Sequence, residues 1–179
     1  MYAVMKTYAR TWLHPVLVLL TGVAAAQTYP VKPVRVVVGF AAGSSSDVTM
    51  RMLGPKLTEL WGQSVVVDNR PGAGGNIAAE FVANAPPDGY TLLFPSASIA
   101  IAQSYYRKLQ YDAVRDLAAV SLASSMPNLL CVNPSLPVKN VKELIALAKK
   151  KRGGLNYASA GIGGSTHLAT ALFMSMTRF

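Results

Sequence analysis

Two loops rich in glycine, serine and alanine carry the residue types from which an anion site can be built. Residues 41–47 read Ala-Ala-Gly-Ser-Ser-Ser-Asp, and residues 160–166 read Ala-Gly-Ile-Gly-Gly-Ser-Thr. Small residues let a ligand approach the backbone, and free N–H groups at a helix start attract negative charge, helped by the helix dipole. Two such loops that face each other could hold a dicarboxylate without an arginine. Loops of this composition are also common structural features of α/β folds, so the pattern leaves a purely structural role open.

A second chemistry to consider is nucleophilic catalysis by a serine. Ser165 and His167 stand two residues apart at the second loop, and residues 44–46 are all serines. An α/β hydrolase carries its nucleophile in a G-x-S-x-G turn, and none of these serines has that setting. We therefore expect no catalytic residue. A hydrolase-like enzyme that uses Ser165 and His167 is the alternative.

Metal, disulfide and nucleotide chemistry are not expected. Cys131 is the single cysteine, and His14 and His167 are the two histidines, so neither an internal disulfide nor a Cys/His zinc site can form. Residues 72–77 lack the third small residue of a dinucleotide-binding G-x-G-x-x-G turn, and no phosphate-binding P-loop motif occurs. We expect no cofactor.

The composition, 51% apolar and 14% charged, is that of a folded protein, and the net charge of +9 favours anionic partners. Residues 149–152 are all basic and end a predicted helix, where cations complement the helix dipole. No aromatic residues are interleaved with them for base stacking. We expect a solvated helix end and no nucleic-acid partner.

The elements that would position the first loop alternate strand, loop and helix. The pattern predicts strands at 34–40, 64–68 and 90–94, and helices at 47–60, 76–84 and 98–109. Asp47 is the expected N-cap of the first helix, which Gly54-Pro55 should kink or split. Three such repeats predict an α/β fold with a doubly wound parallel sheet, whose Gly/Ser loops lie at the carboxyl edge of the strands.

The pattern changes after Asp116. Two strand-like runs at 117–122 and 128–133 flank residues 124–127, which indicates a crossing between domains; a helix at 139–151, a strand at 155–159 and a helix at 165–176 follow. We expect a first α/β lobe over residues 27–122 and a partial second lobe over residues 123–179.

The amino-terminal segment reads as a secretory signal peptide. Lys6 and Arg10 precede an apolar run at 16–26 that ends in Ala24, Ala25 and Ala26. The run is shorter than the about 20 residues that span a membrane. We expect export to the periplasm and cleavage near Ala26, which removes residues 1–26.

Four motifs resemble one family in order and spacing. They lie at 29–40, at 65–76 with the turn Asn69-Arg-Pro-Gly-Ala-Gly-Gly-Asn76, at 87–93 and at 157–168. Together they resemble the Bug-type extracytoplasmic solute-binding receptors of tripartite tricarboxylate transporters. The resemblance implies a periplasmic-binding-protein-like fold of two doubly wound α/β lobes, the second incomplete here. It also implies that a monomer closes on a small organic anion, a di- or tricarboxylate or related acid, and delivers it to membrane permease subunits.

The resemblance also implies which residues contact the ligand. Backbone amides and hydroxyls of the two loops would hold a carboxylate, and the end of the third strand would line the cleft. The implied ligand-binding residues are Phe40, Ala42, Gly43, Ser44, Ser45, Asp47, Ser96, Ala97, Ser159, Ala160, Gly161, Gly164, Ser165, Thr166 and His167.

This sequence departs from the family pattern in two places. The first loop of the family is rich in proline and glycine, whereas residues 41–46 here are mostly alanine and serine. Family members are also much longer, which indicates a fragment or a truncated gene product. The alternatives to a receptor are therefore an exported hydrolase-like enzyme and a truncated fragment that binds nothing.

Overall fold

The computed structural model describes residues 29–151 and 153–178. The predicted signal peptide and its cleavage site near Ala26 lie outside these residues. Within the described part, no helix is long and apolar enough to cross a membrane.

A parallel sheet forms the centre of the first body of the chain. Its strands are β1 (Val34–Val38), β2 (Val65–Asn69) and β3 (Thr91–Phe94), in the order β2-β1-β3. Val36 of β1 pairs with Val67 on one side and with Leu92 on the other. The predicted strands and their doubly wound order are confirmed here, with boundaries shifted by one or two residues. Because the strands are parallel, the loops that follow them meet at one edge.

Helices cover this sheet and continue into the rest of the chain. They are α1 (Ser45–Trp61), the short 3-10 helix η1 (Ala73–Gly75), α2 (Asn76–Ala83), α3 (Ser98–Tyr105), α4 (Val141–Lys150) and α5 (Ser165–Thr177). Val36 and Val38 pack against Met50 of α1 on one face of the sheet. Val37 points to the other face, because side chains alternate along a strand, and it is also fully buried. On that face α2 contacts β1 and β3. Both faces of β1 are therefore covered, as its continuous apolar run predicts.

The start of α1 differs from the sequence prediction. Ser44, not Asp47, is the N-cap: its Oγ accepts a hydrogen bond from the Asp47 N–H at 3.3 Å. Asp47 lies in the first turn, where a carboxylate is also favoured by the helix dipole.

The expected split of α1 is wrong, because the helix runs as one element through Pro55. Its apolar residues on both sides of the proline, Met50 and Leu57, pack on the same sheet cluster. This shared packing offsets the hydrogen bond that proline cannot make.

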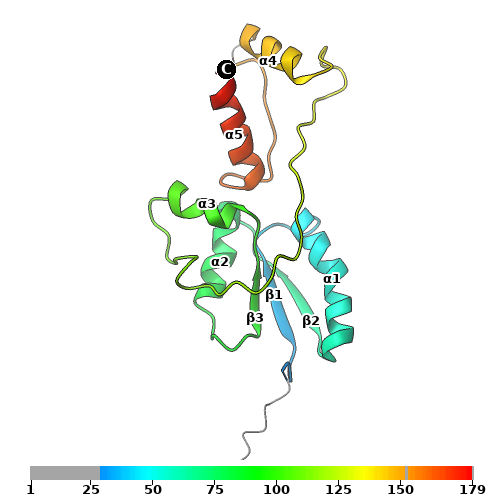
Figure 1. Cartoon of the computed structure of the whole chain (residues 1–179), viewed down its shortest axis with the longest axis vertical. Helices are drawn as coiled ribbons and strands as arrows, with labels where there is room; N and C mark the ends of the chain where they lie inside the picture. Colours follow the sequence, from blue (N-terminus) through cyan, green and yellow to red (C-terminus); the bar gives the residue numbers. More distant parts are fainter. Residues whose placement is uncertain (1–28, 152, 179) are drawn as a thin grey trace, which may run out of the picture.

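Neither the second body nor the segment that leads to it has a strand among its described residues, and this corrects three predictions. Residues 117–122, 128–133 and 155–159 are extended but belong to no ladder, and residues 118–133 are exposed. A strand needs a neighbour for its N–H and C=O groups, and no neighbouring strand lies beside these runs in the described part. The second body consists of α4 and α5, joined by an extended return (Figure 1).

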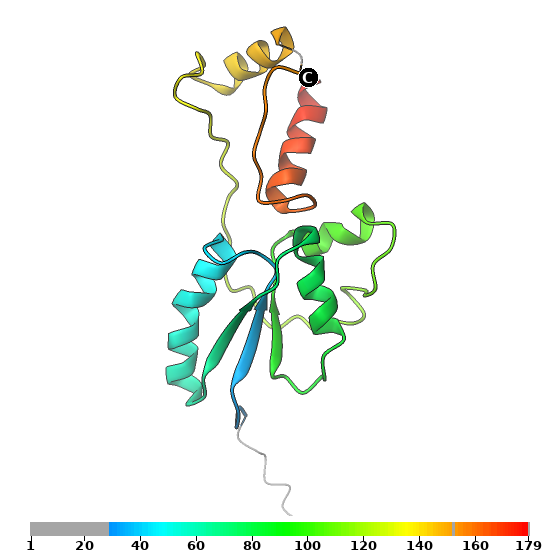
Figure 2. The same cartoon turned by 180° about the vertical axis from the view of Figure 1, so that it is seen from behind.

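The two bodies are joined by the long extended segment that follows the first (Figure 1, Figure 2). We refer to residues 29–116 as the first lobe and to residues 139–151 and 153–178 as the second lobe. The amino-terminal end of α5 points toward α2 and α3 of the first lobe in both views (Figure 1, Figure 2). The second Gly-rich loop, which precedes α5, therefore lies at the junction of the lobes.

A candidate ligand site between the lobes

A cavity of about 400 Å³ lies where the lobes meet. The first lobe contributes the loop after β1 and the loop after β2, namely Gly39, Phe40, Ala41, Pro71, Gly72, Ala73 and Gly74, together with Tyr106. The second lobe contributes Ala160, Gly161 and Ile162. The volume is within the range of small-molecule sites.

The lining of this interlobe cavity is apolar in its side chains and polar in its backbone. Among the described residues that line it, none has a charged side chain, and the Tyr106 hydroxyl is the one polar side-chain group. That hydroxyl lies 3.5 Å from the Ile162 carbonyl oxygen of the other lobe. An anion in this cavity would have to be held by N–H groups and hydroxyls rather than by an ion pair.

The lobes touch through backbone on one side of the cavity. A Cβ atom built on Gly74 would lie 2.6 Å from the carbonyl carbon of Gly163 and 3.0 Å from the Gly164 nitrogen. Within the first lobe, a Cβ on Gly39 would lie 2.7 Å from the Cα of Gly75. Glycine at these positions is what allows the loops to meet this closely.

A chain of polar side chains fixes the first predicted loop from both ends. Asn69 donates from Nδ2 to the Phe40 carbonyl at 3.1 Å, and Arg51 donates from Nη2 to Asn69 Oδ1 at 3.2 Å. Arg51 Nε also donates to both Asp47 oxygens at 3.0 Å, and Asp47 Oδ2 accepts from the Gly43 N–H at 2.8 Å. Hydrogen bonds from Arg51 and then from Gly43 lower the pKa of Asp47 to about 2. Asp47 is 1% exposed, so its carboxylate holds the loop rather than facing a ligand.

The second predicted loop is held by its own side chains. Thr166 Oγ1 accepts from the Ala160 N–H at 3.1 Å, Ser159 Oγ accepts from the Gly161 N–H at 3.4 Å, and His167 Nδ1 accepts from the Gly163 N–H at 3.4 Å. The N-cap of α5 is Gly164, which offers no side chain to the first turn. The first-turn N–H groups of α5 have no intrahelical acceptor, so this end can receive an anion.

The ring of His167 is used in packing and in this loop. Its centroid lies 6.3 Å from that of Tyr105, edge to face, across the junction of the lobes. Since Nδ1 accepts from the Gly163 backbone, the hydrolase alternative, in which His167 would activate Ser165, has no support.

Three of the predicted ligand residues line the interlobe cavity: Phe40, Ala160 and Gly161. The other predicted ligand residues lie in the two Gly-rich loops, in the helix turns that follow them, or before α3. Ala42 and Gly43 precede the N-cap of α1, Ser44, and Ser45 and Asp47 lie in its first turn. Ser159 and Gly164 lie before α5, and Ser165, Thr166 and His167 lie in its first turn. Ala97 is exposed before α3.

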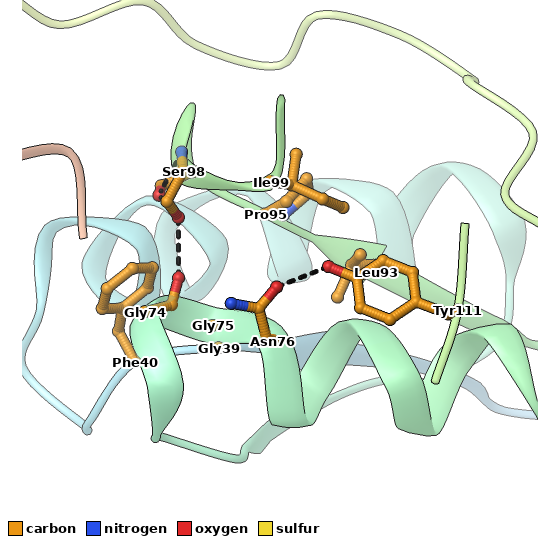
Figure 3. Close-up of a pocket in the computed structure, with 11 residues that line it drawn as sticks. Gly39, Phe40, Gly74, Gly75, Asn76, Leu93, Pro95, Ser98, Ile99 and Tyr111 are labelled. Atoms are coloured by element: carbon orange, nitrogen blue, oxygen red, sulfur yellow. Dashed lines mark hydrogen bonds between the residues drawn. The ribbon is translucent and has the colours of Figure 1, made fainter. Parts of the chain in front are cut away.

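Ser96 belongs to a second, much smaller cavity of about 10 Å³ inside the first lobe. This small cavity lies under the turn 72–75 and is also lined by Asn76, Ser98 and Tyr111 (Figure 3). Gly39, Phe40 and Gly74 line both cavities, so the turn stands between this water-sized space and the larger interlobe cavity.

Sequence reasoning missed the loop after β2 as a wall of the interlobe cavity. Residues 71–74 are a Pro/Gly turn, which was considered as a nucleotide motif and as part of a family motif but not as a ligand-contacting segment. The signal was available, because β1 and β2 are parallel neighbours and their following loops must meet at one edge. No sequence feature predicts that Tyr106 and Ile162 line the cavity.

Comparison with known proteins identifies the family. Residues 49–177 match the profile of the tripartite tricarboxylate transporter family receptor. The chain belongs to this receptor family. BugT of Bordetella pertussis is 38% identical to it over 167 residues, which cover 90% of this chain and 51% of BugT. A UPF0065 protein encoded in the tcbD-tcbE intergenic region of Pseudomonas sp. strain P51 is 37% identical over 165 residues, covering 86% of this chain and 49% of that protein.

Solved structures give the same family and the fold. Rpa4515 of R. palustris with adipate aligns with a TM-score of 0.79 at 40% identity, covering 84% of this receptor chain and 50% of that chain. MatC (Rpa3494) from Rhodopseudomonas palustris with bound malate aligns with a TM-score of 0.74 at 32% identity, covering 84% and 51%. The periplasmic binding protein BugD aligns at 0.69 and 30%, covering 84% and 50%. The resemblance and the periplasmic-binding-protein-like fold class are thus confirmed, and the chain spans about half the length of these relatives.

Proposed function

We propose that this receptor captures a small organic anion, a di- or tricarboxylate or related acid, between its two lobes. The observation that carries the proposal is the interlobe cavity itself, to which both Gly-rich loop regions contribute. The carboxylate would be received by N–H groups at the start of α5, where the N-cap offers no competing side chain. The apolar walls from Phe40, Pro71 and Ile162 would pack against the body of the acid.

Membership of the receptor family supports the wider role. The receptor would be exported to the periplasm, act as a monomer and pass its ligand to permease subunits of a tripartite tricarboxylate transporter. No bond is made or broken in this role, so it is a binding protein and not an enzyme. Adipate and malate, seen with two structural relatives, are the first acids to test.

A ligand titration tests the proposal. Adipate, malate and citrate are added to the purified chain, and the melting temperature and the heat of binding are measured. A ligand at 100 times its Kd stabilises the folded state by about 2.7 kcal/mol, so at least one acid should raise the melting temperature. The neutral diamide of adipic acid is the control and should not. If no acid of the series moves the melting temperature or releases heat, the proposed function is wrong for this chain.

A further inference from the structure

The backbone of the turn at 72–75 adopts an unusual conformation for its whole length. The φ angles are 134° at Gly72, 47° at Ala73, 65° at Gly74 and 98° at Gly75. All lie in the region that L-residues with a side chain rarely adopt, and Ala73 is in it despite its Cβ. Such a backbone persists only where its surroundings hold it.

Three successive carbonyl groups of this turn are hydrogen-bonded, the first within the turn and the other two by side chains outside it. The Gly72 carbonyl accepts from the Gly75 N–H at 2.9 Å, and the Ala73 carbonyl accepts from Asn76 Nδ2 at 2.6 Å. The Gly74 carbonyl accepts from Ser98 Oγ at 2.7 Å (Figure 3). Ser98, at the start of α3, is 3% exposed, so its hydroxyl competes with little water for this bond.

The Asn76 amide is itself oriented by a buried tyrosine. Tyr111 donates from its hydroxyl to Asn76 Oδ1 at 2.6 Å, and the two residues are 4% and 7% exposed (Figure 3). Because the Ala73 carbonyl can only accept, the amide nitrogen must face it and the amide oxygen must face Tyr111. The network therefore has one consistent set of donors and acceptors. Burial, and then the charge of Glu80, raise the pKa of Tyr111, so the phenol keeps the proton that it donates.

The far side of the same turn faces the second lobe. Gly72, Ala73 and Gly74 line the interlobe cavity, and the Gly74 backbone lies directly against Gly163. The same four-residue turn is therefore held by the buried side chains and in contact with the second lobe.

We propose that Asn76, Ser98 and Tyr111 are positioning residues, which hold the turn 72–75 as the seat against which the second lobe closes. Through this seat they set the affinity of the interlobe cavity for its carboxylate. The part of the proposal that concerns affinity rests on the proposed function, whereas the part that concerns the seat rests on the contacts of the turn.

Two variants remove one hydroxyl each from the network: Tyr111→Phe and Ser98→Ala. The matched control is Tyr157→Phe, because Tyr157 is 51% exposed and lines neither cavity. All are made on a Cys131→Ser background with spin labels at Lys56→Cys in α1 and Ser175→Cys in α5, both exposed positions. The label-to-label distance distribution and the affinity for adipate are measured at a temperature at which circular dichroism shows every variant folded.

The network variants should broaden the interlobe distance distribution and weaken adipate binding by about tenfold, while Tyr157→Phe leaves both unchanged. A purely structural role would lower the melting temperature of Tyr111→Phe and Ser98→Ala but move neither readout in the folded protein, and that result would overturn the proposal. If one of the two network variants does not fold, the distance distribution and adipate affinity of the other test the proposal. If the parent chain binds no acid, the proposed function fails. The distance distributions then still test whether the network holds the turn 72–75 against the second lobe.

Discussion

Gly74 and Gly163 meet across the lobes with too little space for a side chain on Gly74. A Cβ on Gly74 would lie 2.6 Å from the Gly163 carbonyl carbon and 2.8 Å from its oxygen. Real Cβ atoms do not approach backbone at these distances, so the contact depends on the absence of a side chain. One wall of the interlobe cavity is therefore formed where the backbones of the two lobes touch.

Replacing Gly74 by alanine should therefore separate the lobes. The methyl group meets backbone that cannot rotate away, and φ of 65° adds strain of about 1–2 kcal/mol to the folded state. We expect Gly74→Ala to weaken acid binding by at least about tenfold, which corresponds to 1.4 kcal/mol. Calorimetric titration measures the affinity, and urea unfolding measures the free energy of unfolding.

Gly62→Ala is the matched control for this prediction. Gly62 has φ of 64°, but a Cβ there would meet nothing within 4 Å. Both variants should lose free energy of unfolding through backbone strain, Gly74→Ala the more because its methyl group also meets Gly163, whereas only Gly74→Ala should lose affinity. Equal affinity in the two variants would show that the lobes do not depend on this contact.

Acid should destabilise the protein partly through Asp47. Its pKa in the folded protein is about 2, below the ordinary value of 3.8. A carboxyl whose folded-state pKa is lowered stabilises the fold above its unfolded-state pKa and loses that contribution as the pH falls toward the folded value. The stability should therefore drop between about pH 4 and pH 2, as measured by urea midpoints over that range.

Asp47→Asn should flatten this pH dependence, because the amide does not titrate and so has no ion pair with Arg51 to lose as the pH falls. Asp116, whose pKa Arg115 also lowers to about 2, keeps part of the slope in the variant. Glu59→Gln is the control, since Glu59 forms only an exposed pair with Lys56 on the surface of α1. A slope that Asp47→Asn leaves unchanged would contradict the role assigned to this carboxylate.

Thr166 should matter to binding through its hydroxyl. Its Oγ1 fixes the Ala160 N–H at the interlobe cavity, and a hydrogen bond of this kind contributes about 1 kcal/mol. Thr166→Val keeps the shape of the side chain and should weaken acid binding about fivefold. Thr170→Val, one turn further along α5, removes a hydroxyl that bonds only the Thr166 carbonyl and should bind normally. Isothermal titration with adipate compares them, and equal affinities would refute the prediction.

The first lobe could be predicted from the sequence because its signals are local. The β-branched run at 34–38, the Gly-rich loops and the helical periodicity at 45–61 each specify an element through near neighbours. The capping of α1 was shifted by three residues because Ser44 and Asp47 are both good cap residues. Which of the two caps the helix depends on the hydrogen bonds of Arg51 and Asn69, and the local sequence pattern does not show these bonds.

The candidate site was only partly predictable for the same reason. The loops after β1 and before α5 have a composition that indicates ligand contact, and Phe40, Ala160 and Gly161 do line the cavity. Tyr106 reaches it because α3 ends there, and Asn76 acts through a partner 35 residues away. Contacts of this kind depend on tertiary packing, which periodicity does not encode.

The extended run at 117–133 gives the last prediction, because its composition predicted strands that the structure does not form. Val120, Leu122 and Leu129 are each more than four-fifths exposed, at 84%, 84% and 82%. Amide hydrogens with no ladder partner exchange at rates close to those of an unfolded chain. Hydrogen exchange followed by mass spectrometry should show rapid exchange over 117–133 and strong protection over Val34–Val38, which serves as the internal control. Protection of the run in the same sample would mean that it pairs with another strand in solution, and would contradict the finding that residues 29–151 and 153–178 contain a single sheet.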